Sequence, residues 1–201
     1  MTPAKQRLSR PVPRTAFHGV LAILAALAIT IAVPLPARAE IPSFSETEMV
    51  RTGHETFGKA SSELASVVEY VFKKKGRPTA YIVGQQASAA LGVGLNYGEG
   101  WLRQKSGGQT KVYWQGPSVG VDVGGDGARV LVLVYKLQEP QQLFDRFGGV
   151  DGSAYVVGGV GVTFRTNNKV NLAIIRTGLG LRLGVNAGYL KYTRKPTWNP
   201  F

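Results

Sequence analysis

The spacing of hydrophobic residues changes from a helical to a strand period near residue 78. Hydrophobic side chains recur every three or four positions in the second half of residues 45–75, at Leu64, Val67, Val68, Val71 and Phe72. This spacing places them on one side of an amphipathic helix. Ser45 followed three positions later by Glu48 is a capping-box pattern, and Gly58 interrupts the periodicity. The segment therefore predicts two successive helices.

From residue 79 onward, short hydrophobic segments are separated by turn signals such as Ser106-Gly107-Gly108. The expected strands cover residues 80–83, 87–96, 98–104, 111–114, 118–123, 129–135, 153–166, 169–175 and 178–192, and a short amphipathic helix covers residues 140–147. Strands without long intervening helices favour an antiparallel barrel or sandwich. We predict a mainly β fold, namely a small closed antiparallel β-barrel of about eight strands with the N-terminal helical segment packed on it.

Residues 129–135 are hydrophobic on both faces of the expected strand. One face must meet the barrel interior, and we expect the helix that contains Leu64 to cover the other. The segment lacks the alternation of an outer-membrane barrel, and Pro196 and Pro200 would interrupt a final strand. An outer-membrane barrel is therefore the weaker alternative. Residues 196–201 are expected to form an aromatic tail that packs Trp198 and Phe201 onto the domain.

Glycine accompanies aromatic and β-branched residues in this chain, whereas flexible linkers pair it with serine. Of the 26 glycines, 23 lie between Gly76 and Gly188. Glycine inside a strand costs backbone entropy, so its repeated use indicates bulges, bends or close approach of neighbouring groups. These features suit the tightly curved wall of a small barrel.

Residues 1–39 have the pattern of a cleaved secretory signal. Basic residues precede an apolar stretch over residues 19–33, which is shorter than the ~20 residues that span a bilayer. Ala37-Arg38-Ala39 then supplies small residues at a cleavage position. The chain contains no cysteine, which excludes disulfides and thiolate metal sites. We expect export to the periplasm, with a helical segment over residues 40–78 and a barrel over residues 79–195.

The formal net charge is +12, from 24 basic and 12 acidic residues. Residues 1–39 hold five of the basic residues and none of the acidic ones, so the remaining chain carries +7. This charge favours anionic partners such as lipid, lipopolysaccharide or acidic glycan. The densest basic cluster consists of Lys73, Lys74, Lys75 and Arg77. We expect this lysine cluster to cap a helix first, and to contact an anion or membrane surface second.

Glu99 has the most informative surroundings of the carboxylates, because it lies between two glycines and two aromatic residues. A strand would place Tyr97, Glu99 and Trp101 on the same face. If that face points inward, Glu99 must pair with a cation. The candidate partners are Arg129, Arg176 and Arg182. A structural ion pair is the simpler interpretation, and a ligand-binding site formed by Glu99, Trp101 and these arginines is the alternative.

The sequence shows no pattern of a catalytic, metal or cofactor site. Residues 116–120 match the G-x-S-x-G form of a hydrolase nucleophile, but no histidine follows Ser118 and a strand is expected after it. Asp126 and Asp151 each precede a glycine and are more simply turn residues than cation ligands. We expect no enzymatic activity, no cofactor and no metal. Export also argues against a nucleic-acid partner.

Several motifs occur in an order that resembles one protein family. They are Tyr97-Gly98-Glu99-Gly100, Trp114-Gln115-Gly116-Pro117-Ser118-Val119-Gly120, Gly149-Val150-Asp151-Gly152-Ser153-Ala154-Tyr155, Ile175-Arg176-Thr177-Gly178, Gly188-Tyr189-Leu190-Lys191 and Trp198-Asn199-Pro200-Phe201. Over residues 44–201 the chain resembles the bacterial envelope integrity protein A family, long catalogued as a domain of unknown function. The resemblance implies a periplasmic eight-stranded barrel with helical decoration and no established catalytic residues. Three of the motifs are also distantly similar to the lipid-binding SYLF domain, whose basic lipid-binding helix has no clear match here.

We therefore expect a non-enzymatic periplasmic protein that supports cell-envelope integrity by binding an anionic lipid or polysaccharide. The alternative is a structural or scaffolding partner of envelope proteins, acting through residues 196–201 or the lysine cluster. A hydrolase is the least supported function, because it would need a second carboxylate near Glu99. Any membrane contact is expected to be peripheral.

Overall fold

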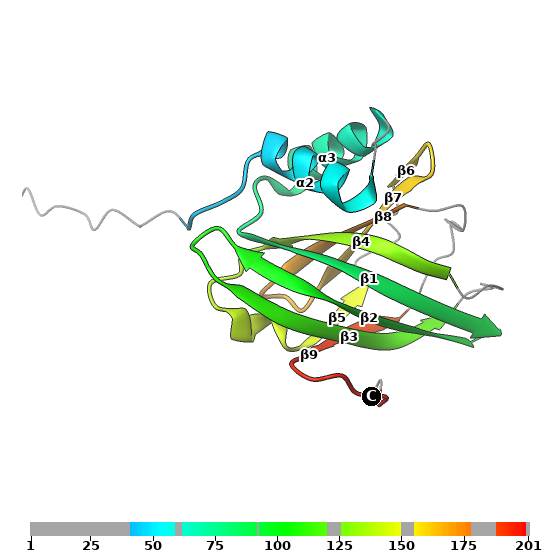
Figure 1. Cartoon of the computed structure of the whole chain (residues 1–201). Coiled ribbons are helices and arrows are strands. Elements are labelled where there is room, and N and C mark those ends of the chain that lie inside the picture. Colours follow the sequence, from blue (N-terminus) through cyan, green and yellow to red (C-terminus); the bar gives the residue numbers. More distant parts are fainter. Residues whose placement is uncertain are drawn as a thin grey trace, which may run out of the picture. The chain divides into compact units, whose positions relative to one another are not determined.

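In the part of the chain that the structure describes, eight antiparallel strands close into a barrel and two helices lie over one side of it (Figure 1). The computed structural model describes residues 41–58, 62–91, 93–119, 126–149, 155–177 and 188–199. The helices are α2 (Glu46–Phe57), α3 (Ser62–Lys75) and the 3-10 helix η1 (Pro140–Leu143). The strands are β1 (Ala80–Leu91), β2 (Val93–Gln104), β3 (Gln109–Val119), β4 (Asp126–Tyr135), β5 (Arg146–Gly149), β6 (Tyr155–Val157), β7 (Val160–Thr166), β8 (Asn171–Thr177) and β9 (Tyr189–Thr193).

Strand β5 closes the barrel by pairing on both of its edges. The strands follow one another in the order β5-β9-β3-β2-β1-β4-β8-β7, and β5 also pairs with β7. In this closing pair, Gly148 lies opposite Thr166 and Gly149 lies opposite Arg165. The short strand β6 pairs with β7 outside the ring. The structure thus confirms the predicted mainly β class and the closed antiparallel barrel.

One predicted strand contains a hairpin. The pattern predicts a single strand over residues 87–96, whereas β1 ends at Leu91 and β2 begins at Val93, directly opposite it. Small and apolar residues continue on both sides of this point, so the hydrophobic pattern has no break to mark the turn. The prediction is wrong here because alternation alone does not distinguish one long strand from two paired ones.

Two further elements differ from the expectation. The amphipathic helix expected over residues 140–147 is a single 3-10 turn, and the residues after it form β5. Pairing with β7 and β9 satisfies the backbone groups of β5, and this tertiary pairing overrides the local helical pattern. The strand expected over residues 153–166 forms β6 and β7 in its described part. Gly158 and Gly159 make the turn with φ values of 55° and 82°, which glycine adopts without steric cost.

Hydrophobic side chains pack on both faces of the barrel wall. Alternate residues of β4 (Val130, Val132 and Val134) belong to the interior core, together with side chains from the other strands. The intervening Leu131 and Leu133 belong to a separate outer core, in which α3 contributes its buried face. The members from α3 are Leu64, Val67, Val68 and Val71. The helix therefore covers the outer face of this strand, as predicted.

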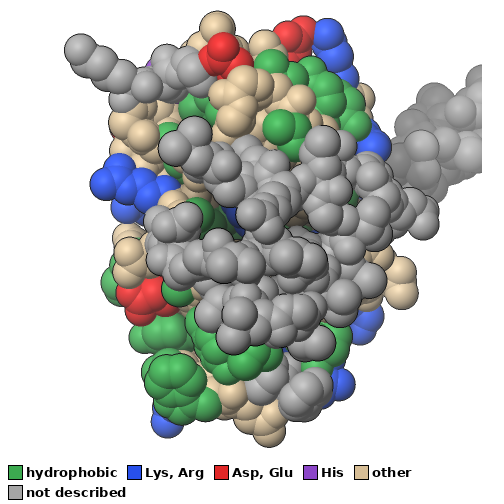
Figure 2. Space-filling view, turned by 90° about the vertical axis from the view of Figure 1, so that its right-hand side faces the viewer, with side chains coloured by type: hydrophobic (Ala, Val, Ile, Leu, Met, Phe, Trp, Pro, Cys, Tyr) green, Lys and Arg blue, Asp and Glu red, His purple; other side chains and the backbone are tan. Residues whose placement is uncertain are grey.

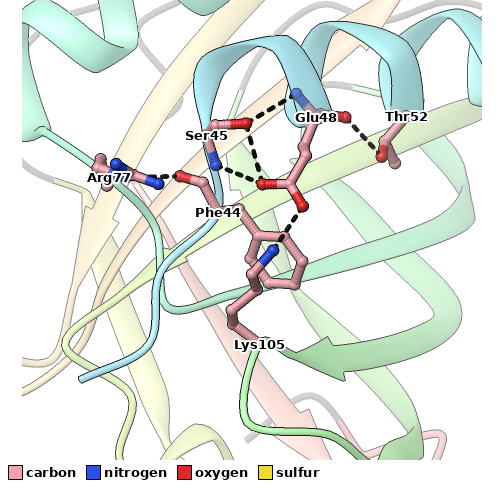
Figure 3. Close-up of polar contacts among 6 residues, drawn as sticks. All are labelled: Phe44, Ser45, Glu48, Thr52, Arg77 and Lys105. Carbon is pink, nitrogen blue, oxygen red and sulfur yellow. Dashed lines mark hydrogen bonds and ion pairs between the residues drawn. The ribbon is translucent and has the colours of Figure 1, made fainter. Parts of the chain in front are cut away.

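A capping box and one ion pair fix the start of α2 against the barrel (Figure 3). The Glu48 amide donates to Ser45 Oγ at 3.2 Å, and the Ser45 amide donates to the Glu48 carboxylate at 2.7 Å. The other carboxylate oxygen accepts a hydrogen bond from Lys105 Nζ, just after β2. These contacts lower the pKa of Glu48 to about 2. The hydrogen bond from Lys105 has the largest effect, and the two hydrogen bonds with Ser45 come next.

The indole of Trp114 explains two of the strand glycines. Trp114 is 1% exposed on β3, and its ring lies against β1 and β2 at Gly84 and Gly98. A Cβ at Gly98 would overlap this ring, and a Cβ at Gly84 would overlap the Glu99 carbonyl oxygen. The predicted close approach is confirmed at these positions, because only glycine leaves room for so large an interior side chain.

Candidate functional site

Glu99 and Trp101 lie on the outward face of β2, away from the interior core. The Glu99 side chain is 42% exposed, and its carboxylate accepts from Lys111 Nζ at 3.1 Å and from Gln85 Nε2 at 3.3 Å. Lys111 lies opposite Trp101 in the β2–β3 pairing, with Nζ 5.3 Å from the centre of the indole. The expected ion pair of Glu99 therefore exists, but its cation is Lys111. Counting the hairpin register outward from the Ser106-Gly107-Gly108 turn would have placed Lys111 opposite Trp101, next to Glu99.

Two of the three arginines predicted with Glu99, Arg129 and Arg176, do not lie beside it. Arg129 of β4 donates from Nη1 to the Thr56 carbonyl at 2.9 Å and so holds the last turn of α2. Arg176 of β8 lies opposite Val130, on the interior side of the wall. Arg182 lies outside the described residues. Their partnership with Glu99 was predicted for an inward face, and Glu99 faces outward.

The lysine cluster makes contacts within its own part of the fold. Lys73 pairs with Glu69 one helical turn earlier, and Lys74 Nζ lies 4.9 Å from the centre of the Phe164 ring. Lys75 Nζ lies 5.6 Å from the same ring, and Arg77 Nε donates to the Phe44 carbonyl at 3.3 Å. These cations occupy the last turn of α3 and the residues after it, where positive charge stabilises the helix dipole.

A basic groove of about 630 Å³, which sequence reasoning missed, lies beside β5 and β9. Its basic side chains are Arg146, Lys191, Arg194 and Lys195. Asp145 is the acidic residue in the lining, and its carboxylate accepts from the Arg146 amide at 2.7 Å and from Asn167 Nδ2 at 2.9 Å. Arg146, Arg194 and Lys195 have no ion pair among the described residues.

Aromatic rings hold two of these cations in place. The guanidinium carbon of Arg194 lies 4.6 Å from the centre of the Phe144 ring, and that of Arg146 lies 5.6 Å from the centre of the Tyr189 ring. Arg194 and Lys195 are adjacent in the sequence, but Arg146 joins them only through the pairing of β5 with β9. The sequence alone could therefore group Arg194 with Lys195, but it could not add Arg146 to them.

An aromatic groove of about 650 Å³ lies on the outward side of β1, β2 and β3, beside residues 196–198. The aromatic side chains that face it are Tyr97, Tyr113 and Trp198. The Tyr97 hydroxyl donates to the Trp198 carbonyl at 3.0 Å, and the two ring centres are 5.5 Å apart. Hydrophobic side chains gather in the lower part of the face in Figure 2, at the level of the C-terminal segment in Figure 1.

The C-terminal segment thus differs from the expected tail. Trp198 was expected to pack onto the domain, but it is held by its backbone carbonyl and by one ring contact, and it is 86% exposed. Phe201 lies outside the described residues. Because Pro196 and Thr197 line both grooves, the segment separates the aromatic groove from the basic one.

Polar groups occupy one part of the barrel interior. Trp114 Nε1 donates to Gln86 Oε1 at 3.0 Å, and Gln86 Nε2 donates to Asn96 Oδ1 at 3.4 Å. Arg165 is 6% exposed and donates to the Gly188 carbonyl. Burial lowers the pKa of the Arg165 guanidinium and raises the pKa of the Tyr192 hydroxyl. Arg165 Nε and the Tyr192 hydroxyl are buried without a hydrogen-bond partner among the described residues.

Within the described residues, no group of three or more His, Cys, Asp or Glu side chains could hold a metal ion. In the same residues, no helix is long and apolar enough to cross a membrane.

Comparison with known proteins gives a match over the whole described domain. The family model for envelope integrity protein A matches residues 42–201. The crystal structure of a β-barrel-like uncharacterized protein from Brucella abortus is 49% identical in sequence, with a TM-score of 0.72, and the match covers 80% of this chain and 99% of that one. No curated protein matches the chain. The distant similarity to the SYLF domain stays a prediction. The match to the family model and the shared barrel show that this chain belongs to the envelope integrity protein A family, whose role lies in the integrity of the cell envelope.

Proposed function

We propose that this protein acts in the periplasm, without catalysing a reaction, by binding an anionic component of the cell envelope. The ligand is a lipid headgroup or a polysaccharide that carries phosphate or carboxylate groups. The observation that carries the proposal is the basic groove beside β5 and β9, where Arg146, Arg194 and Lys195 have no ion pair among the described residues.

The geometry of the basic groove suits an anionic group. A guanidinium presents a planar set of donors that matches phosphate and carboxylate oxygens, and the rings of Phe144 and Tyr189 restrict its movement before a ligand arrives. Asp145 brings one negative charge to a lining with four basic side chains, and it forms no ion pair with them among the described residues. The charge of +7 outside residues 1–39 also favours such ligands.

The lysine cluster is the weaker site for the same ligand. Lys73 is paired with Glu69, and Lys74 and Lys75 contact the ring of Phe164. An anion that binds there must compete with the Glu69 carboxylate for Lys73. In the basic groove, Arg146, Arg194 and Lys195 have no ion pair among the described residues, so an anion displaces no carboxylate from them.

The proposed periplasmic location and the proposed non-enzymatic role are supported by two separate sets of observations. The signal pattern of residues 1–39 and membership of an envelope family support the periplasm. Glu99, the carboxylate that a hydrolase would use, is partly exposed and paired with Lys111. Among the described residues, Glu99 is the one carboxylate in the lining of the aromatic groove, whereas glycoside hydrolysis canonically uses a pair of carboxylates.

Co-sedimentation with vesicles tests the lipid source of the anion, and binding to polygalacturonate tests the polysaccharide source. We expect binding to phosphatidylcholine vesicles that contain phosphatidylglycerol, or to polygalacturonate, and none to phosphatidylcholine alone. Raised salt should weaken this binding, since it screens the attraction between the groove and the anion. If the protein binds neither the anionic vesicles nor polygalacturonate, the proposal is overturned.

Substitutions in the basic groove identify the site. Arg146→Gln combined with Arg194→Gln should lower the affinity about tenfold or more, because two charge-assisted contacts are lost. Lys73→Gln combined with Lys74→Gln removes the same charge elsewhere and should change the affinity much less. If Arg194→Lys replaces Arg194→Gln in the double variant, part of the lost affinity should return. Urea unfolding checks that each variant folds. Equal binding by the groove variant and the unaltered protein would refute the assignment.

A further inference from the structure

We propose that the aromatic groove binds the rings of an uncharged saccharide. This site goes beyond the proposed function and does not depend on it, because its lining, its charge and its position differ from those of the basic groove. The groove of about 650 Å³ lies within the range of small-molecule sites in proteins.

The shape of the lining suits a flat ring with polar edges. Tyr97, Tyr113 and Trp198 supply aromatic surfaces on which the C–H face of a sugar ring can pack. Gln85 and Glu99 lie in the same lining and supply donors and acceptors for hydroxyl groups. A saccharide is the ligand class that presents both an apolar ring face and hydroxyls around its edge.

The charge of the groove argues against an anion. Glu99 is the charged residue in its lining, and Lys111 neutralises it at a distance of 3.1 Å. The lining therefore offers an anionic group no net positive charge, whereas the basic groove on the other side of Thr197 offers cations. An uncharged ligand keeps the pair of Glu99 and Lys111 intact.

The polar groups argue against an acyl chain. A hydrocarbon chain in this groove would cover the Glu99 carboxylate and the Gln85 amide without replacing their hydrogen bonds to water, which costs free energy. Hydroxyl groups replace these hydrogen bonds, so the lining selects a hydroxylated ligand over a purely apolar one.

Trp198 is already positioned to take part in binding. Its carbonyl accepts from the Tyr97 hydroxyl, which fixes the segment beside the groove, while the residue as a whole is 86% exposed. Together with Tyr97 and Tyr113 it forms a contiguous apolar surface, and an exposed surface of this kind is a feature of binding sites. Anchoring before the ligand arrives reduces the entropy that ordering the segment would cost.

Titration calorimetry and saturation-transfer NMR with chitotetraose and maltotetraose test this site. We expect at least one of the two saccharides to bind, and Trp198→Ala and Tyr97→Ala each to lower its affinity about tenfold or more. Tyr97→Phe keeps the ring and loses only the hydroxyl, so it should lose less. Leu95→Ala is the matched control, because Leu95 is 38% exposed on the same strand and lies outside the groove lining.

The outcomes separate this site from the proposed anion site. The variant with Arg146→Gln and Arg194→Gln should bind the saccharide normally, and Trp198→Ala should bind anionic vesicles normally. Because Trp198 is almost fully exposed, its replacement leaves the fold intact. Binding of neither saccharide, unchanged binding by Trp198→Ala, or binding of the acyl probe monolaurin in place of both would each overturn the proposal.

Discussion

Trp114 connects the barrel interior with two neighbouring strands through one side chain. Its ring lies against Gly98, and its Nε1 donates to Gln86, which in turn donates to Asn96. A residue with a larger side chain at position 98 would move the ring and weaken this buried network. Unsatisfied polar groups in such a network cost more than the hydrogen bonds contribute when they are formed.

Gly98→Ala should therefore destabilise the protein by about 1 to 3 kcal/mol, which is the usual cost of forcing extra volume into a packed interior. Urea unfolding followed by tryptophan fluorescence measures the change. Gly148→Ala is the control, because a Cβ there meets no atom within 4 Å. The close-approach interpretation fails if both substitutions have equal effects.

The surroundings of Glu99 show how far sequence reasoning reaches for a single residue. Tyr97, Glu99 and Trp101 do share one face, as the strand period requires. Which face points inward could not be decided, because aromatic residues suit both a core and a binding surface. In the structure the Trp114 ring lies against Gly98 on the inward face of β2. Tyr97, Glu99 and Trp101 alternate with Gly98 and therefore point outward.

Among the elements, α2 depends on a contact outside the helix. Glu48 belongs to the capping box of Ser45, and the same carboxylate pairs with Lys105 after β2. The pKa of Glu48 is lowered to about 2, below the ordinary value of 4.5. Folding therefore gains from the ionised carboxylate above about pH 5, and this gain is lost as the pH falls toward 2.

Glu48→Gln should lower the free energy of unfolding at neutral pH by about 0.5 to 1 kcal/mol, because glutamine keeps the cap but loses the ion pair. Stability of the variant should also fall less between pH 5 and pH 2. Urea unfolding at several pH values measures both effects. Glu46→Gln, in the same helical turn, serves as control, and an acid dependence equal for both variants would contradict the role of Lys105.

The elements themselves were largely predictable, and their connections were less so. The capping box at Ser45 and the apolar face containing Leu64 follow from local spacing, and both are present. Strand β5 was not predicted, because its four residues form a strand only through their partners in β7 and β9. The basic groove was missed for the same reason, since that pairing brings Arg146 to the residues after β9.

At the scale of the whole molecule, closure of the β-barrel depends on β9, because this strand pairs with both β3 and β5. A chain that ends after Thr177 should lose cooperative unfolding and tend to aggregate, because two strand edges are left without partners. A chain that ends after Thr193 keeps β9 and should stay folded and elute as the full chain does, although it loses Trp198. Far-UV circular dichroism, urea unfolding and size-exclusion chromatography compare the two, and cooperative unfolding of the shorter chain would contradict this prediction.

The position of β9 also constrains the order in which the strands can pair while the chain folds. Tyr113 of β3 pairs with Thr193, so an early strand must wait for one of the last described residues before its second edge is filled. Until then β3 presents open backbone groups to any other extended chain nearby. The unfolded chain is therefore most exposed to mispairing before β9 takes its place, and a chaperone that shields extended segments would act at that stage.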